Sequence, residues 1–225
     1  MPPAFHPYGP SHKAALLATL VLFIAMLVLA RTRHAVIAQR VLGGMLLALY
    51  PVGLAVHAYY GSLTAQTALP LQFCDIAAIA GGIALWTRRQ FWCEVVYFFG
   101  LAGTLQGLLT PALIYEFPDL RYFMFFLMHG GVPVTSIYVV TAMRHRPQPG
   151  AVMRVMGFSL AWYAVIAVIN FAFGVNYAFQ CAKPPQASLF DHLGPWPWYN
   201  FSAIGLGLVF YSVLYLPFAF RKPAP

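Results

Sequence analysis

Charged residues are scarce in this sequence. Of its 225 residues, only 8% are Asp, Glu, Lys or Arg, whereas 61% are hydrophobic. A soluble domain carries about 25% charged residues, so the composition excludes an ordinary globular protein and predicts a membrane protein with several spans. The formal charge of +8 does not indicate a nucleic-acid partner, because the basic residues lie in short clusters between apolar runs.

Cysteine is scarce as well. Cys74, Cys93 and Cys181 form no CxxC pair, no metal-ligand spacing and no disulfide framework. We also find no internal repeat and no domain boundary. Residues 1–225 are therefore expected to form a single integral membrane domain.

Long apolar runs, by contrast, are abundant. Seven of them come near the roughly 20 residues that a helix needs to cross the hydrocarbon core, and they predict an all-α, polytopic bundle of seven transmembrane helices. The runs are Lys13–Ala30, Arg40–Tyr60, Pro70–Trp86, Phe91–Thr110, Arg121–Met143, Val152–Ala172 and Tyr199–Phe220. The third is the shortest, and we expect Gly81 and Gly82 to break it.

The basic residues predict the orientation of the bundle. On one side of the predicted membrane lie only Lys13, Arg121 and Lys183, and the other ten lie on the opposite side, Arg221 and Lys222 among them. The positive-inside rule then predicts an outer N-terminus and a cytoplasmic C-terminus.

Polar residues within the runs concentrate toward the predicted outer side. The third run opens with the sequence LPLQFCDIAA, which places Gln72, Cys74 and Asp75 near the start of a membrane helix. Ionisable groups in the hydrocarbon are functional-site candidates by default. Counting residues from the outer boundary puts Cys74 at ~6 Å and His129 at ~12 Å depth. We expect one polar pocket there, and inner helix halves that are apolar apart from flanking Arg.

A thiol and an imidazole at similar depth indicate nucleophilic chemistry. A cysteine attacks as its thiolate, and a nearby histidine can take the proton, so Cys74 is the candidate nucleophile and His129 the candidate base. Asp75 could orient the imidazole, or it could face another partner. The candidates for further orienting groups or for donors to an acyl oxyanion are Gln72, Gln106, Asn170, Asn176 and Tyr177.

Alternatives to this chemistry remain open. A disulfide between Cys74 and Cys181 would abolish the nucleophile. Histidines bonded across helices are commonly structural, and small residues such as Gly103 and Gly107 commonly serve helix packing. Gly130 and Gly131, with Pro133, would permit a kink below His129.

The loop before the last run ends in GPWPWY, at Gly194–Tyr199. Aromatic residues at this position are typical of the belt that anchors a protein at the membrane interface. Trp196, Trp198 and Tyr199 are therefore the predicted lipid-interface residues, and a rigid lid is the alternative.

Five motifs together resemble a known family. They are LPLQFCD at Leu69–Asp75, FFGLAGTLQGLLTP at Phe98–Pro111, FFLMHG at Phe125–Gly130, NYAF at Asn176–Phe179 and GPWPWY at Gly194–Tyr199. In this order they resemble the YwaF-like bacterial integral membrane proteins, whose animal relatives are the transmembrane protein 164 lipid acyltransferases. The androgen-induced membrane hydrolases, which pair Thr with His, are more distant.

The resemblance implies an acyltransferase with a Cys nucleophile and a His base, here Cys74 and His129. It implies membrane phospholipids and lysolipids as partners, no cofactor and no metal. One departure is Gln72, because many bacterial members have His two residues before the Cys. We expect a multi-pass protein of the cell membrane, the inner membrane of a bacterium.

Two other function classes remain as alternatives. A zinc-dependent seven-helix lipid hydrolase would draw on His57, His129, His192 and Asp75, although their spacing matches no zinc motif. A non-catalytic lipid-binding or transport protein is the second alternative. Retinal binding is disfavoured because the last run has no Lys, and proton-coupled transport because the midplane is nearly free of charge.

Overall fold

The described residues fall into two compact units. The computed structural model describes residues 5–184 and 188–220. Unit 1 comprises residues 5–62 and 73–147, and unit 2 comprises residues 63–72, 148–184 and 188–220. The single-domain expectation for residues 1–225 stays a prediction, and each unit is described by itself.

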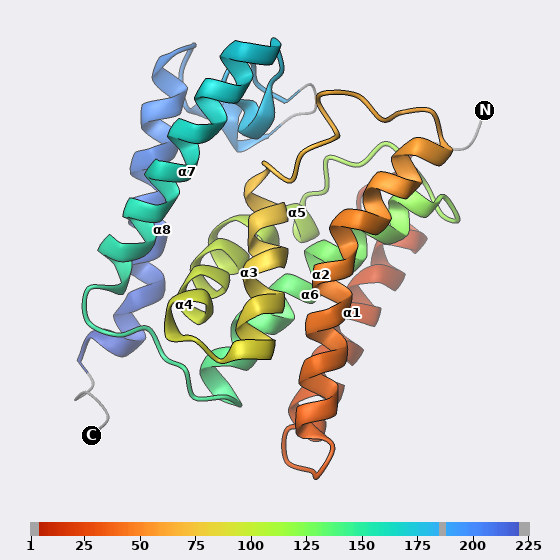
Figure 1. Ribbon diagram of the computed structural model, residues 1–225, viewed down its shortest axis with the longest axis vertical. Coiled ribbons are helices and arrows are strands. Elements are labelled where there is room, and N and C mark those ends of the chain that lie inside the picture. Colours follow the sequence, from red (N-terminus) through yellow and green to blue (C-terminus); the bar gives the residue numbers. More distant parts are fainter. Residues whose placement is uncertain (1–4, 185–187, 221–225) are drawn as a thin grey trace. The chain divides into compact units, whose positions relative to one another are not determined.

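Both units are built from helices (Figure 1). Unit 1 contains α1 (Pro10–Leu29), α2 (Ala35–Tyr59), α3 (Phe73–Thr87), α4 (Gln90–Phe99), the π-helix η1 (Gly100–Thr104), α5 (Leu105–Leu109) and α6 (Leu120–Thr141). Unit 2 contains α7 (Ala151–Phe173), the 3₁₀ turns η2 (Tyr177–Phe179) and η3 (Leu189–His192), and α8 (Trp198–Ala219).

The all-α membrane architecture is confirmed. Six helical segments in the described part of the chain are long and apolar enough to cross a membrane, with α4, η1 and α5 acting as one segment, Gln90–Leu109. The remaining predicted run, which is the third, forms α3, which is apolar but has only 15 residues. At 1.5 Å per residue α3 spans about 22 Å, less than the hydrocarbon core of about 30 Å. The protein is therefore a multi-pass membrane protein whose third helix is short.

Helix α3 lies among the other helices of unit 1. It contacts α2, α4, η1 and α6, and Figure 1 shows it between α2 and α4. Its buried face consists mostly of small residues, namely Ala77, Ala78, Ala80, Gly81, Gly82 and Ala84. Small side chains let membrane helices approach closely, which is why this helix can be central.

The closest approach joins α3 to α2 at two glycines. A Cβ added to Gly82 would lie 2.9 Å from the carbonyl oxygen of Gly43 and against the side chain of Leu47. The expectation that Gly81 and Gly82 break the third helix is wrong, because α3 continues to Thr87. These glycines serve the helix contact, not a bend.

Helix α6 begins with a charged cap outside its apolar span. The Asp119 carboxylate accepts hydrogen bonds from the backbone N–H of Arg121 at 2.8 Å and from its guanidinium at 2.7 and 2.9 Å. These bonds from Arg121 hold the pKa of the Asp119 carboxyl below its ordinary value. The Arg121 guanidinium also lies over the rings of Tyr115 and Tyr60, so this cap joins α6 to the end of α2.

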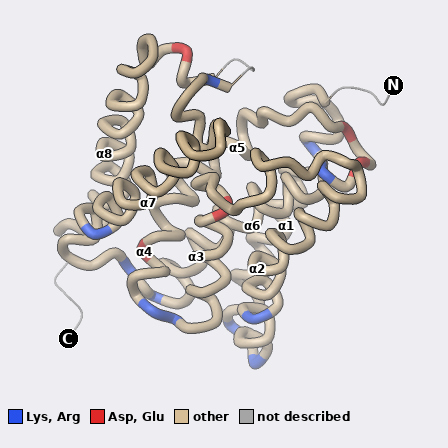
Figure 2. Tube along the Cα trace, turned by 45° about the horizontal axis from the view of Figure 1, so that its top comes forward, with Lys and Arg blue, Asp and Glu red and all other residues tan. Residues whose placement is uncertain are grey.

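Basic residues of unit 1 gather at the opposite end from that cap. Figure 2 shows blue positions at the α1–α2 and α3–α4 turns at one end of unit 1, and both red and blue positions near the beginnings of α1 and α6 at the other. This separation of charged residues between the two ends of unit 1 agrees with the predicted order of the helices. Which end faces the cytoplasm stays a prediction. Arg221 and Lys222, which entered that prediction, lie outside the described residues.

The expectation of apolar inner helix halves is wrong at Glu94. Its side chain is 1% exposed within α4 and accepts a hydrogen bond from Gln90 at 3.0 Å. Nearby at this end, Arg88 donates to Gln39, which donates to the hydroxyl of Tyr138. These bonds join the α3–α4 turn to α2 and α6, and a separate bond from Gln90 to the Arg146 carbonyl joins α4 to the segment after α6.

Unit 2 pairs α7 with α8 and adds the segment that precedes α3. Gly174, with φ of +62°, ends α7 in the left-handed conformation that glycine adopts most easily. Apolar side chains remain exposed along both helices, for example Val168 and Phe171 on α7 and Val209 and Val213 on α8. Such helices suit a lipid environment.

We expect Gly82→Ala to lower the stability of the fold by about 1–3 kcal/mol, because the added methyl group overpacks the α2–α3 contact. Gly44→Ala is the matched control, since a Cβ there meets no atom within 4 Å. The melting temperature of the purified protein in detergent should fall for Gly82→Ala and stay unchanged or rise slightly for Gly44→Ala. Equal melting temperatures for both variants would contradict the close contact.

Candidate active site

The His129 side chain is fixed within α6. It is 6% exposed, and Nδ1 lies 2.9 Å from the carbonyl oxygen of Phe125. Its ring also stacks on the Phe125 ring, with centroids 3.9 Å apart and planes at 19°. A carbonyl oxygen can only accept, so Nδ1 carries the proton and Nε2 is left with a lone pair. The imidazole is thus prepared to accept a proton at Nε2.

The edge of that ring lies against α5. A Cβ added to Gly107 would lie 2.7 Å from Nε2 of His129 and closer still to the neighbouring ring carbon. Only glycine fits at this position without moving the ring. The GxxxG step of Gly103 and Gly107 is therefore asymmetric, because a Cβ at Gly103 would meet nothing within 4 Å.

Cys74 is the second residue of α3 and is partly exposed. Its thiol interacts with the side chains of Thr104 and Asp75, while the Thr104 hydroxyl donates to the backbone carbonyl of Phe99 at 3.5 Å. Thr104 is fully buried and ends the π-helix η1. A π-helix has one extra residue per turn and is often found at functional sites.

Thr104 and Gly107 bring the two candidate residues to one helix segment. Residues three apart face the same side of a helix, about 5–6 Å from each other. Cys74 contacts the first and His129 abuts the second. The η1–α5 segment therefore adjoins both candidate residues, and a joint action of the thiol and the imidazole stays a prediction.

The predicted depths of Cys74 and His129 stay predictions. Helix α3 begins at Phe73 and is short, while residues 63–72 belong to unit 2.

The other candidates near the site are distributed between the units. Asp75 follows Cys74 in the first turn of α3. Gln106 is exposed on α5, and its backbone carbonyl accepts from Thr110. Gln72 belongs to unit 2, where its side-chain oxygen accepts from the backbone N–H of Ala178 at 2.9 Å. Their orienting roles stay predictions.

In unit 2, a hydrogen-bond network includes Asn170, Asn176 and Tyr177. Asn170 exchanges bonds with the backbone N–H and C=O of Tyr177 at 2.8 and 3.0 Å and donates to Gln180 at 3.1 Å. Asn176 bonds to the backbone of Cys181 and Ala182. The Tyr177 hydroxyl donates to the carbonyl of residue 65 at 2.6 Å. These groups hold the loop before α8, and their predicted contact with an oxyanion stays a prediction.

The three predicted lipid-interface aromatics differ in exposure. Trp196 and Trp198 are 63% and 65% exposed, whereas Tyr199 is 1% exposed and donates its hydroxyl to the Phe179 carbonyl at 2.6 Å. The two tryptophans are thus available to lipid, while Tyr199 is part of the loop's interior.

Two alternatives from the sequence were a disulfide between Cys74 and Cys181 and a zinc site. Cys74 and Cys181 are both free thiols. No three His, Cys, Asp or Glu side chains in residues 5–184 and 188–220 lie close enough to hold a metal ion together. Of the zinc candidates, His57 bonds through Nδ1 to Ser62 at 3.0 Å.

Sequence reasoning missed Thr104, Glu94 and His12. A signal existed for Glu94, since it is an ionisable residue within an apolar run, whereas His12 lies directly before the first run. Thr104 gave none, because a helical wheel of constant period does not anticipate the extra residue of a π-helix.

Comparison with known proteins gives three findings. The sequence model of the TMEM164 family matches residues 7–215. An uncharacterized protein of Treponema pallidum (strain Nichols) is 28% identical over 152 residues, which are 67% of this chain and 62% of that protein. The chain thus matches less than two thirds of that relative's length. No solved structure matches.

We expect Gly107→Ala to slow any reaction that uses the His129 imidazole by about 10²-fold, since a 1 Å displacement of a catalytic group has effects of this size. Gly103→Ala is the matched control on the same segment, and it should retain wild-type turnover. Release of fatty acid or transfer of a labelled acyl chain in detergent-solubilised protein measures both. Full turnover of Gly107→Ala would contradict a working role for the ring in its present position.

Proposed function

The chain belongs to the TMEM164 family, and we propose that it is a phospholipid acyltransferase that carries the acyl group as a thioester on Cys74, with His129 as general base. The observation that carries this proposal is the state of the His129 imidazole. Nδ1 donates to the Phe125 carbonyl, so Nε2 can accept a proton. The η1–α5 segment supports the pairing, because Cys74 interacts with Thr104 and His129 lies against Gly107 on this segment.

In the first half-reaction, Cys74 attacks the ester carbonyl of a phospholipid. The thiol proton passes to Nε2 of His129 as the bond from sulfur to the acyl carbon forms. Breaking the ester bond releases the lysophospholipid oxygen, which takes the proton from His129. The products are a lysophospholipid and the acyl-thioester, and the imidazole is neutral again.

In the second half-reaction, the hydroxyl of a lysolipid attacks the thioester. His129 accepts the hydroxyl proton and returns it to the leaving sulfur, so the free thiol of Cys74 is regenerated. Water in place of the lysolipid gives a free fatty acid. Transfer and hydrolysis thus share one intermediate and differ only in the acceptor.

The surroundings of Cys74 support this chemistry. The Thr104 side chain interacts with the Cys74 thiol, and its hydroxyl could turn from the Phe99 carbonyl to donate to the thiolate that leaves in the second step. Asp75 and Gln106 are the remaining candidates of unit 1 for orienting or oxyanion-binding roles. The chemistry requires no cofactor, because thiol and imidazole supply the nucleophile and the proton transfers.

The proposed substrates come from the membrane itself. Phospholipids and lysolipids present their ester groups near the interface, within reach of a site buried about one or two turns below it. Trp196 and Trp198, both exposed, are the proposed lipid contacts of the loop before α8. The proposed location is the cell membrane, which is the inner membrane if the cell has two.

We expect incubation with mixed phospholipids to produce a hydroxylamine-sensitive acyl adduct on Cys74, seen by mass spectrometry of the intact protein and its peptides. The adduct should be absent from Cys74→Ala and at least about 10²-fold slower to form in His129→Ala, as for loss of a general base. Cys181→Ser, which removes the exposed thiol, is the control and should be acylated normally.

Adduct mass identifies the donated chain, and its decay with and without added lysolipid separates transfer from hydrolysis. A Cys74 thiol that no phospholipid acylates, together with turnover unchanged in Cys74→Ala, would refute the proposal.

A further inference from the structure

His12 is a fully buried polar residue that the proposed reaction does not use. It lies in the first turn of α1 and is 0% exposed. The backbone N–H of Tyr8 donates to Nδ1 at 2.9 Å, and Nε2 lies 2.9 Å from the carbonyl oxygen of Leu108. Since Nδ1 accepts, Nε2 must carry the proton and donate to that carbonyl. Both ring nitrogens are thus satisfied.

The carbonyl that His12 binds belongs to the last turn of α5. The last four carbonyls of a helix have no partner within the helix, and burying one without a hydrogen bond is costly. Helix α5 ends at Leu109, so the Leu108 carbonyl needs a partner from elsewhere. His12 supplies it from α1, 96 residues away in the sequence.

That bond lies next to the candidate site. Leu108 directly follows Gly107, against which the His129 ring rests. A shift of the last turn of α5 would therefore move the surface that sets the position of His129.

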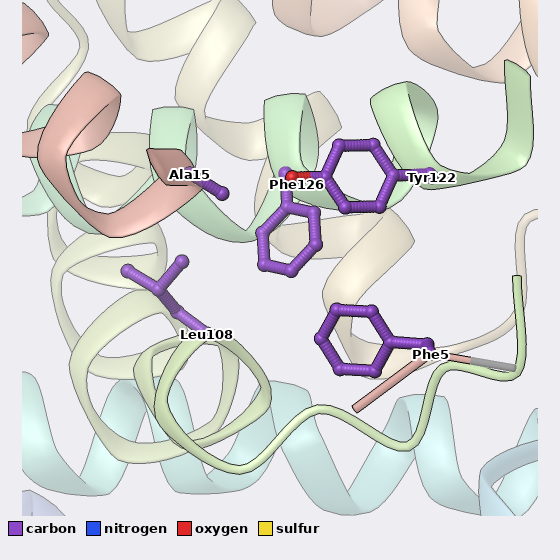
Figure 3. Close-up of a cluster of buried hydrophobic side chains, with 5 residues drawn as sticks. All are labelled: Phe5, Ala15, Leu108, Tyr122 and Phe126. Atoms are coloured by element: carbon purple, nitrogen blue, oxygen red, sulfur yellow. The ribbon is translucent and has the colours of Figure 1, made fainter. Parts of the chain in front are cut away.

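A second route joins His12 to His129 through aromatic rings. The His12 ring lies beside Phe126, with centroids 5.6 Å apart. Phe126 belongs to a buried cluster with Phe5, Ala15, Leu108 and Tyr122, and Figure 3 shows the side chains of Leu108 and Phe126 directed toward each other. Phe125 directly precedes Phe126. Its ring stacks on the His129 ring, and its backbone carbonyl accepts a hydrogen bond from Nδ1 of His129.

We propose that His12 is a positioning residue for the Cys74–His129 pair, holding the last turn of α5 so that Gly107 and Phe125 keep the imidazole in place. This inference rests on the proposed function for its catalytic readout. Removing the hydrogen bond from His12 to the Leu108 carbonyl should slow the reaction. Without this donor the last turn of α5 is held less firmly, and the His129 ring loses its fixed position.

Two substitutions separate the donor from the ring. His12→Phe keeps an aromatic ring beside Phe126 but loses the hydrogen-bond donor. His12→Gln keeps an N–H donor at about the reach of Nε2. We expect His12→Phe to lower kcat for acyl transfer by about tenfold or more with KM changed less than about twofold, and His12→Gln to restore most of the rate.

A structural role alone gives a different result. In that case turnover falls only in proportion to the folded fraction, as measured by the melting temperature and by gel filtration in detergent. That outcome, or equal rates for the Phe and Gln variants, overturns the proposal.

Alkylation of Cys74 by a lipid-soluble maleimide provides a readout without acyl chemistry. Its rate as a function of pH, resolved by peptide mass spectrometry, reports how the thiol is coupled to His129, with Asp75 beside the sulfur in every variant. We expect His129→Ala to shift the Cys74 profile to higher pH and His12→Phe to shift it in the same direction. The exposed Cys181 is the internal control and should not shift.

The two proposals can fail separately. If wild-type Cys74 is never acylated but His129→Ala and His12→Phe shift its alkylation profile together, the acyltransferase proposal fails and the positioning role stands. If Cys74 is acylated and His12→Phe leaves both kcat and the alkylation profile unchanged, the positioning role is overturned alone. A profile that neither variant shifts overturns it as well.

Discussion

The close contact of α3 with its neighbours is the constraint on which unit 1 depends. Helices α2, α4 and α6 and the π-helix all contact it, and its small residues set how near they come. Where α2 and α3 cross, Gly43 and Gly82 leave backbone against backbone. Since Cys74 is the second residue of this helix, the packing that holds unit 1 together also fixes the position of the thiol.

The structure divides its polar groups into three sets with different surroundings. At the basic end, Glu94 is bonded within α4 and Gln39 joins α2 to α6. In unit 2, Asn170 and its partners hold the loop before α8. At the candidate site, Nδ1 of His129 donates to a backbone carbonyl and Nε2 keeps its lone pair. A polar group that retains bonding capacity in an apolar setting is suited to chemistry, whereas a fully bonded one is suited to holding structure.

Much of this arrangement follows from the sequence. Apolar runs predicted the six long segments of the described residues and the shorter α3, because the hydrocarbon core requires backbone groups to be satisfied within each segment. The resemblance in five motifs predicted the family. The sequence pattern failed at Gly81 and Gly82, which pack against α2 and its neighbours instead of breaking α3. The contacts of Thr104, Gly107 and His12 depend on side chains from distant segments, and no local pattern encodes them.

The π-helix has a consequence for comparing relatives of this protein. Its extra residue rotates everything after it by about 100° relative to an uninterrupted α-helix. A relative that lacks one residue between positions 100 and 104 would present a different face of α5 to α3 and α6, even with every later residue identical. In an alignment, a one-residue gap here therefore marks a change in the reaction surface, while a gap of the same size in the loop before α8 changes only a connection.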